Sequence, residues 1–168
     1  MSISFPFKFV DLGTTPPFKI EANPDFPTET DPVCILNNLG VPPERDDFIT
    51  VGAGLGANGP DPWELTFHWA TTGGPVGGTW QLDAFLESVS STIPNFTVPG
   101  FPFILPGAQI PGKYAQTVAV APFTGFPFTF PPGVHLFRLF TTLRFGTLPA
   151  VRVAGRAEGP LMEFYHPV

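Results

Sequence analysis

Hydrophobic and polar residues alternate along residues 2–10, as they do in a β-strand with one buried face. One face carries Ile3, Phe5, Phe7 and Phe9, and the other carries Ser2, Ser4, Pro6, Lys8 and Val10. Pro6 has no N–H group to donate to a neighbouring strand. We therefore predict a strand at the edge of a sheet, or an arm that lies along another surface.

The clearest alternation covers residues 62–70 and resumes at residue 79. The apolar face of the first segment is Trp63, Leu65, Phe67 and Trp69, and that of the second is Trp80, Leu82, Ala84 and Leu86. Residues 71–78 between them are rich in glycine, as hairpin connections are. We predict a β-hairpin whose tryptophans share one inner face, with a helical turn in the second segment as the alternative.

Further short strands are expected along the rest of the chain. The pattern predicts them at residues 48–51, 113–121, 134–145, 151–154 and 161–165, the last two being separated by Gly155 and Gly159-Pro160. Residues 33–39 fit a strand or a helix of one or two turns, because Asp31-Pro32 and Gly40 resemble helix ends. The prolines of residues 13–32 predict an irregular extended connection.

Seven or eight strands with turn residues between them predict an antiparallel β-sandwich with an Ig-like or jelly-roll path. A closed barrel is the second choice. We expect one domain over residues 1–168, in which residues 1–32 form the N-terminal strand and a Pro-rich extended segment, and residues 33–168 form the main sandwich.

Composition supports this fold class. Glycine and proline number 18 and 23, which leaves little room for long helices. Hydrophobic residues make up 43% of the chain and charged residues 13%, so the chain is too apolar for a disordered protein. Proline or a charge interrupts every apolar stretch, so no membrane span is predicted.

Charge and cysteine content exclude further classes. The net charge is −6, and the basic residues of the last third are too scattered for a nucleic-acid surface. The single cysteine, Cys34, cannot form an intrachain disulfide, and no secretion signal is apparent. We therefore expect a cytoplasmic protein without a disulfide.

The candidate chemical motifs are weak. Gly54, Gly56 and Gly59 have the spacing of a dinucleotide-binding loop, but prolines follow where that loop needs a helix. His68, His135 and His166 form no closely spaced ligand pair. We predict no catalytic residue, metal site or cofactor.

Two long segments that combine phenylalanine with proline are unusual for loops. They cover residues 94–112 and 122–133. Large exposed apolar patches mark interaction surfaces, so we predict a non-catalytic structural or interaction module that assembles with itself, or with another protein. The residues expected to mediate contact are Ile3, Phe5, Phe7, Phe9, Phe101, Phe103, Phe126, Phe128 and Phe130. The other interpretation of these loops is that they fold back over their own sandwich.

Two other functions remain open from the sequence. One is a binding protein that holds an apolar small molecule between its sheets, in a cavity lined by Trp63, Trp69, Trp80 and Phe140. The other is a metal enzyme or hydrolase of the sandwich class that uses His68 together with Asp83 or Glu64.

Overall fold

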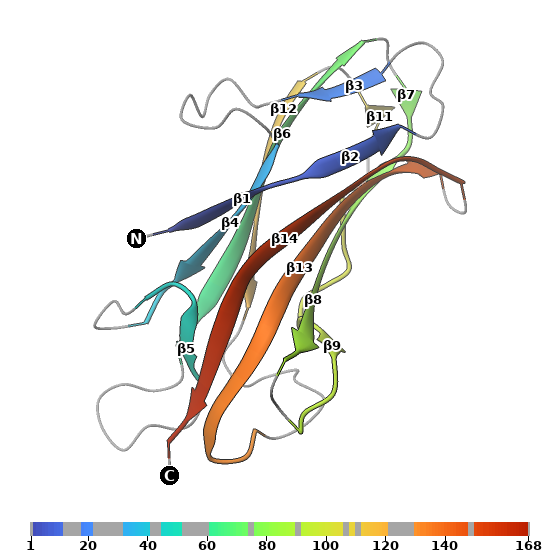
Figure 1. The fold of residues 1–168 in the computed structure, drawn as a ribbon. Helices are drawn as coiled ribbons and strands as arrows, with labels where there is room; N and C mark the ends of the chain where they lie inside the picture. Colours follow the sequence, from blue (N-terminus) through green and yellow to red (C-terminus); the bar gives the residue numbers. More distant parts are fainter. Residues whose placement is uncertain are drawn as a thin grey trace.

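The chain folds into two β-sheets that pack against each other (Figure 1). The computed structural model describes residues 2–11, 18–21, 32–40, 45–51, 61–73, 76–89, 92–105, 108–109, 112–120, 130–147 and 150–167. Every regular element within these residues is a strand. No helix of the described part is long and apolar enough to cross a membrane. The predicted antiparallel β-sandwich is confirmed.

The first sheet is built around one long central strand, β6. Its members are β1 (Ile3–Pro6), β3 (Phe18–Glu21), β4 (Val33–Asn38), β6 (Trp63–Gly73) and β12 (Gly112–Val120). β4 and β3 pair with β6 at different heights, β12 pairs along most of its length, and β1 pairs with β4. Residues 33–38 are thus a strand, one of the two predicted alternatives, whereas β3 lies within the segment predicted to be irregular.

The second sheet is built around two long neighbouring strands. Its members are β2 (Lys8–Asp11), β5 (Phe48–Thr50), β8 (Thr79–Ser88), β9 (Phe96–Thr97), β10 (Phe103–Leu105), β13 (Gly133–Thr147) and β14 (Ala150–His166). β13 lies between β8 and β14, and β5 is parallel to β14. A small separate sheet pairs β7 (Val76–Gly77) with β11 (Ala108–Gln109).

The N-terminal strand belongs to both sheets. β1 pairs with β4 at the edge of the first sheet, and β2 pairs with β14 at the edge of the second. Phe7 lies between the two pairings, and its N–H donates to the Pro32 carbonyl over 2.8 Å. The predicted edge position of this alternating segment is confirmed.

Aromatic side chains fill the space between the sheets. Trp80 of the second sheet packs against Trp69 of the first at 5.2 Å between ring centroids. Trp80 also contacts Phe145 of its own sheet at 4.9 Å and Tyr114 of the first sheet at 6.0 Å. The prediction that the tryptophans share the inner side is confirmed, since Trp63, Trp69 and Trp80 are all at most 1% exposed.

The predicted hairpin is wrong, although both of its strands are present. β6 pairs with β3, β4 and β12, whereas β8 pairs with β9, β10 and β13. After Gly73, which has a φ of 103°, the chain passes through β7 and enters the opposite sheet. Alternation shows which side chains face inward, and two strands in facing sheets satisfy the same pattern as two paired strands.

The two short strands predicted near the C-terminus are one continuous strand, β14. Gly155 pairs with Leu143 of β13, and pairing with β13 continues on both sides of Gly159-Pro160. The pairing register shifts between Arg138 and Phe140, opposite Gly159-Pro160, as in a β-bulge. Here glycine and proline mark a local irregularity and a close approach of side chains, and the strand continues beyond them.

Candidate functional site

The N-terminal strand lies over two glycines of β14. In the pairing register Phe9 is opposite Gly155, and a Cβ at Gly155 would overlap the Phe9 ring. A Cβ at Gly159 would come within 3.1 Å of the Phe5 ring. Because glycine has no side chain, the two rings can approach the backbone of β14 closely. The surface of β4 and β14 that the strand covers, where Gly155 and Gly159 leave room for its rings, is the groove of the N-terminal strand.

Inside the core, Phe7 lies near the first of the two segments rich in phenylalanine and proline, residues 94–112, which we call the first Phe/Pro loop. The ring centroids of Phe7 and Phe101 each lie 6.0 Å from that of Phe67, on β6. Phe5 and Phe7 are each 5% exposed, and Phe101 is 9% exposed. The N-terminal strand and the first Phe/Pro loop, which the sequence suggested separately, therefore both contact the interior side chain of Phe67.

The first Phe/Pro loop covers the free edge of β8. β9 and β10 both pair with β8, and the Val98 N–H donates to the Ala84 carbonyl over 2.9 Å. The Phe101 N–H donates back to the Val98 carbonyl across Pro99-Gly100, where Gly100 has a φ of 93°. This is the type II turn expected of a Pro-Gly pair.

Phe130, the last phenylalanine of the second Phe/Pro segment, lies inside the core. Its ring stacks on Phe164 with a centroid distance of 5.6 Å, and it meets the edges of Phe96 and Phe137. Ile3, Phe9 and Phe103 pack against the core while partly exposed. Phe126 and Phe128 lie outside the described residues. The described members of the predicted interaction set are thus covered at least partly by their own chain, and their contact with a neighbour stays a prediction.

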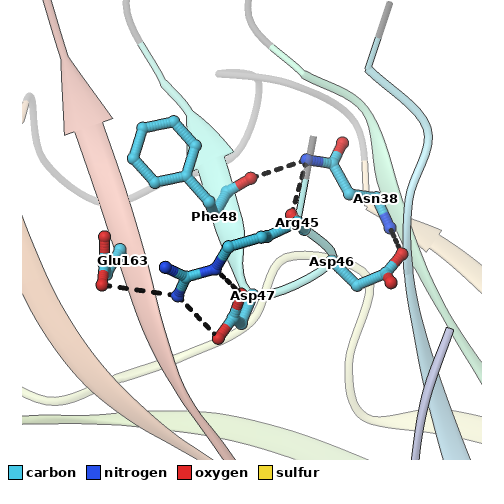
Figure 2. A network of polar contacts seen from close by, with 6 residues as sticks. All are labelled: Asn38, Arg45, Asp46, Asp47, Phe48 and Glu163. Atoms are coloured by element: carbon cyan, nitrogen blue, oxygen red, sulfur yellow. Dashed lines mark hydrogen bonds and ion pairs between the residues drawn. The ribbon is translucent and has the colours of Figure 1, made fainter. Parts of the chain in front are cut away.

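A polar junction joins the first sheet to the second near β5 (Figure 2). The Asn38 side chain, at the end of β4, donates to the carbonyl of Phe48 over 2.6 Å and to that of Arg45 over 3.3 Å. The Asn38 N–H donates to Asp46 Oδ1 over 3.1 Å. Since β5 pairs with β14 of the second sheet, Asn38 fixes a connection between the two sheets.

The exposed side of this junction carries an ion-pair cluster. Arg45 donates through Nε and Nη2 to the two carboxylate oxygens of Asp47, both at 2.9 Å. Glu163 of β14 lies 3.5 Å from Nη2 (Figure 2). The hydrogen bonds that Arg45 donates to Asp47, followed by the charges of both carboxylates, raise the pKa of Arg45. Such exposed pairs contribute little to stability, so the buried amide of Asn38 matters more.

We expect Asn38→Ala to lower the free energy of unfolding by about 2 kcal/mol, because the buried Gly40 N–H and the part-buried Phe48 and Arg45 carbonyls lose a side-chain partner. Asn37→Ala is the matched control, since Asn37 is less buried than Asn38 and its side chain makes a single bond, to Glu64 over 3.1 Å; it should cost about 1 kcal/mol or less. Urea unfolding measures both. Equal losses for the two variants would contradict a special role for Asn38.

His68 lies on the first sheet, whereas His135 and His166 lie near each other at the paired ends of β13 and β14 in the second sheet. His68 is on β6, on the outer side of the first sheet, and is 5% exposed. His135 hydrogen-bonds the Pro131 carbonyl over 2.8 Å, and His166 hydrogen-bonds the Pro167 carbonyl over 2.7 Å. No group of three or more His, Cys, Asp or Glu side chains suited to a metal ion occurs among the described residues.

Of the two acids suggested to act with His68, Glu64 lies four residues away on β6 and accepts a hydrogen bond from Asn37, and Asp83 lies on the other sheet. His68 is on the first sheet, whereas Asp83 lies on the outer side of the second sheet. Asp83 Oδ2 accepts from Thr142 Oγ1 over 2.9 Å and from Arg144 Nη2 over 2.6 Å. Asp83 and Arg144 also line an outer pocket of about 400 Å³. The structure thus places the acid in a polar network remote from the imidazole.

The aromatic side chains suggested for an apolar cavity do not share one space, because the tryptophans lie between the two sheets and Phe140 lies on the outer side of the second sheet. The three tryptophans contact other core rings in the interior. Phe140 instead lies on the outer side, stacked on Phe85 with a centroid distance of 5.3 Å. The Gly54–Gly59 motif falls outside the described residues.

Cys34 of β4 is fully buried. Burial raises the pKa of its thiol strongly above the ordinary value. The thiolate, which is the reactive form, is therefore suppressed in the folded protein.

We expect Cys34 to be inert to a thiol reagent such as DTNB at about pH 8 until the protein unfolds in urea. A Ser4→Cys variant is the positive control because residue 4 is exposed. Its added thiol should react at once. Rapid labelling of Cys34 in the native protein would mean that β1 leaves β4 readily.

The sequence did not single out Lys8 and Arg156, which face each other across β2 and β14 beside a second outer pocket. Only the pairing register brings them together, and no local pattern reveals a register between strands so far apart.

Comparison with protein-family models, with curated proteins and with solved structures gives no significant match, so the function is inferred from the geometry of this chain alone.

Proposed function

We propose that the protein is a non-catalytic structural module that self-assembles by exchanging its N-terminal strand between subunits. The observation that carries the proposal is the position of residues 3–11 at one edge of each sheet. A strand held at an edge can leave without breaking the pairing of the remaining strands. In strand exchange, the same contacts re-form between two copies.

The fit of the strand to its groove supports the proposal. Phe5 and Phe7 are buried, and Phe9 covers Gly155. A chain whose groove is empty would expose apolar surface along β4 and β14, and exposed apolar surface favours association. The strand of another copy presents the phenylalanines that match this groove.

Cross-strand cysteines test the exchange. Ser4 of β1 and Ile35 of β4 are partners in register, and residues opposite each other have Cβ atoms close enough for a disulfide in favourable cases. A Ser4→Cys/Ile35→Cys/Cys34→Ala variant, oxidised at high protein concentration, should give covalent multimers on a non-reducing gel. The multimer fraction should rise with protein concentration before oxidation.

The control uses two strands that exchange cannot separate. Thr66 of β6 and Thr117 of β12 are also in register, with their hydroxyls 2.9 Å apart. The variant Thr66→Cys/Thr117→Cys/Cys34→Ala should give only monomers under the same conditions. If the first variant also forms its disulfide within monomers alone at every concentration, strand exchange is wrong.

Light scattering over a hundredfold dilution then tests the wider proposal. A structural module should show a native mass several times the 18.1 kDa of the chain. If the native mass is a multiple of the chain's mass but the cysteine variant forms disulfides only within single chains, the protein assembles without exchanging its N-terminal strand. A monomer throughout would overturn both.

A further inference from the structure

Two positive charges face each other on the outer side of the second sheet. Lys8 of β2 and Arg156 of β14 are direct partners in the pairing register, and both side chains are exposed. Like charges directly opposite each other destabilise a strand pair. Such an arrangement in a chain with a net charge of −6 needs an explanation beyond sheet pairing.

The partners of Arg156 differ from those of the other arginines. Among the arginine side chains that the structure describes, Arg45, Arg138 and Arg144 each have a carboxylate within ion-pair distance. The guanidinium carbon of Arg156 instead lies 4.3 Å above the centre of the Phe140 ring. Within the described part of the chain, neither Arg156 nor Lys8 has a carboxylate partner.

Phe140 also positions the guanidinium. Its ring lies between Arg156 and Phe85, which stacks on it with an angle of 19° between the planes. A guanidinium that lies over a ring keeps the N–H groups around its own edge available. These groups can bind a planar pair of oxygen atoms in a bidentate manner.

We propose that Lys8 and Arg156 form a binding site for a small molecule that carries a phosphate monoester. They line a pocket of about 500 Å³ together with Pro6 and Glu158, a volume within the ~300–1,000 Å³ of small-molecule sites. Their two positive charges match the −1.5 to −2 or so of a phosphate monoester at neutral pH. Glu158 does not oppose the anion strongly, because Arg138 Nη1 forms an ion pair with it.

The pocket is larger than a bare phosphate group requires. A bound molecule therefore extends beyond its phosphate along Pro6 and the outer side of β2. Binding neutralises the repulsion between Lys8 and Arg156, so part of the affinity comes from relief of an unfavourable contact. The site involves only outward-facing side chains and does not depend on the proposed assembly.

Titration with glycerol 3-phosphate tests the site, with backbone amide NMR signals as the readout and sodium chloride used to hold ionic strength constant. We expect saturable shifts that concentrate at the amides of β2 and β14 around Lys8 and Arg156. Arg156→Gln and Lys8→Gln should each weaken binding about tenfold or more, because each removes a charge-assisted contact. Inorganic phosphate should compete for the same signals.

Arg45→Gln is the matched control, since it removes the same charge from an exposed arginine already held by Asp47. It should leave the dissociation constant unchanged. Arg156→Lys keeps the charge but lacks the bidentate fork, so it should bind more weakly than the unaltered protein and more tightly than Arg156→Gln. Shifts that do not saturate, or that Arg45→Gln reduces equally, would overturn the site.

Discussion

A chain that lacks residues 2–11 is expected not to hold the native sandwich under conditions in which the full chain is folded. Phe5 and Phe7 are each 5% exposed, and burying a phenylalanine side chain contributes roughly 1.5–3 kcal/mol. The two together account for roughly 3–6 kcal/mol, while domains are typically stable by about 5–15 kcal/mol. The deletion also exposes the edge of β4 and the groove over β14.

Urea unfolding followed by tryptophan fluorescence measures the loss, because the tryptophans lie in the core. A synthetic peptide of residues 2–11 should restore part of the lost stability when added to the shortened chain. A peptide of the same composition in scrambled order serves as the control, since it lacks the alternation of the phenylalanines. An unchanged midpoint after the deletion would mean that the strand contributes nothing to closing the sandwich.

Rescue by the peptide also bears on the proposed assembly. If a free strand can occupy the groove, the strand of a second copy can occupy it as well. Rescue without multimers in the cysteine experiment would separate the two ideas: the groove would accept a strand from outside, while the intact chain would keep its own strand in place.

Replacing Trp80 with alanine is expected to lower the free energy of unfolding by about 3–5 kcal/mol. The side chain is fully buried, and it contacts Trp69 and Tyr114 of the first sheet as well as Phe145 of its own. Its removal leaves a cavity where the sheets meet, and the surrounding rings can fill such a cavity only partly.

Chemical denaturation and calorimetry together measure this effect. Ile104→Ala on β10 is the control because Ile104 is 49% exposed, and it should change stability by about 0.5 kcal/mol or less. Trp80→Phe should lie between alanine and the original residue, since it keeps an aromatic ring in the interior. A loss for Trp80→Ala as small as that of Ile104→Ala would contradict the central position of Trp80 in the core.

The aromatic and proline content has a physical explanation in the fold. Phe101 and Phe130 reach the core from segments that the sequence could describe only as apolar loops. Proline restricts the chain before folding, so such segments lose less conformational entropy when they dock. Internal burial and assembly are not alternatives for the N-terminal strand, because strand exchange uses the same buried contacts between copies.

The alternation of residues determined most of the strands and the direction of their side chains. Trp63, Trp69 and Trp80 point inward as predicted, and Ile3 to Phe9 occupy sheet edges, because a period of two and the missing N–H of Pro6 are local properties. Partner choice is not local. β6 and β8 satisfy one pattern in two different sheets, and the glycines of β14 could be recognised as contact points for Phe5 and Phe9 only in the folded chain.

The sequence also identified one candidate site and missed the other. The phenylalanines of the predicted interaction set stand out in the sequence because their side chains and spacing are unusual there. The Lys8 and Arg156 pair does not stand out, since the two residues are far apart in the chain and ordinary by themselves. The sequence by itself determined which residues are apolar, alternating and edge-compatible; the tertiary structure decided which strands pair, because register depends on packing energies summed over both sheets.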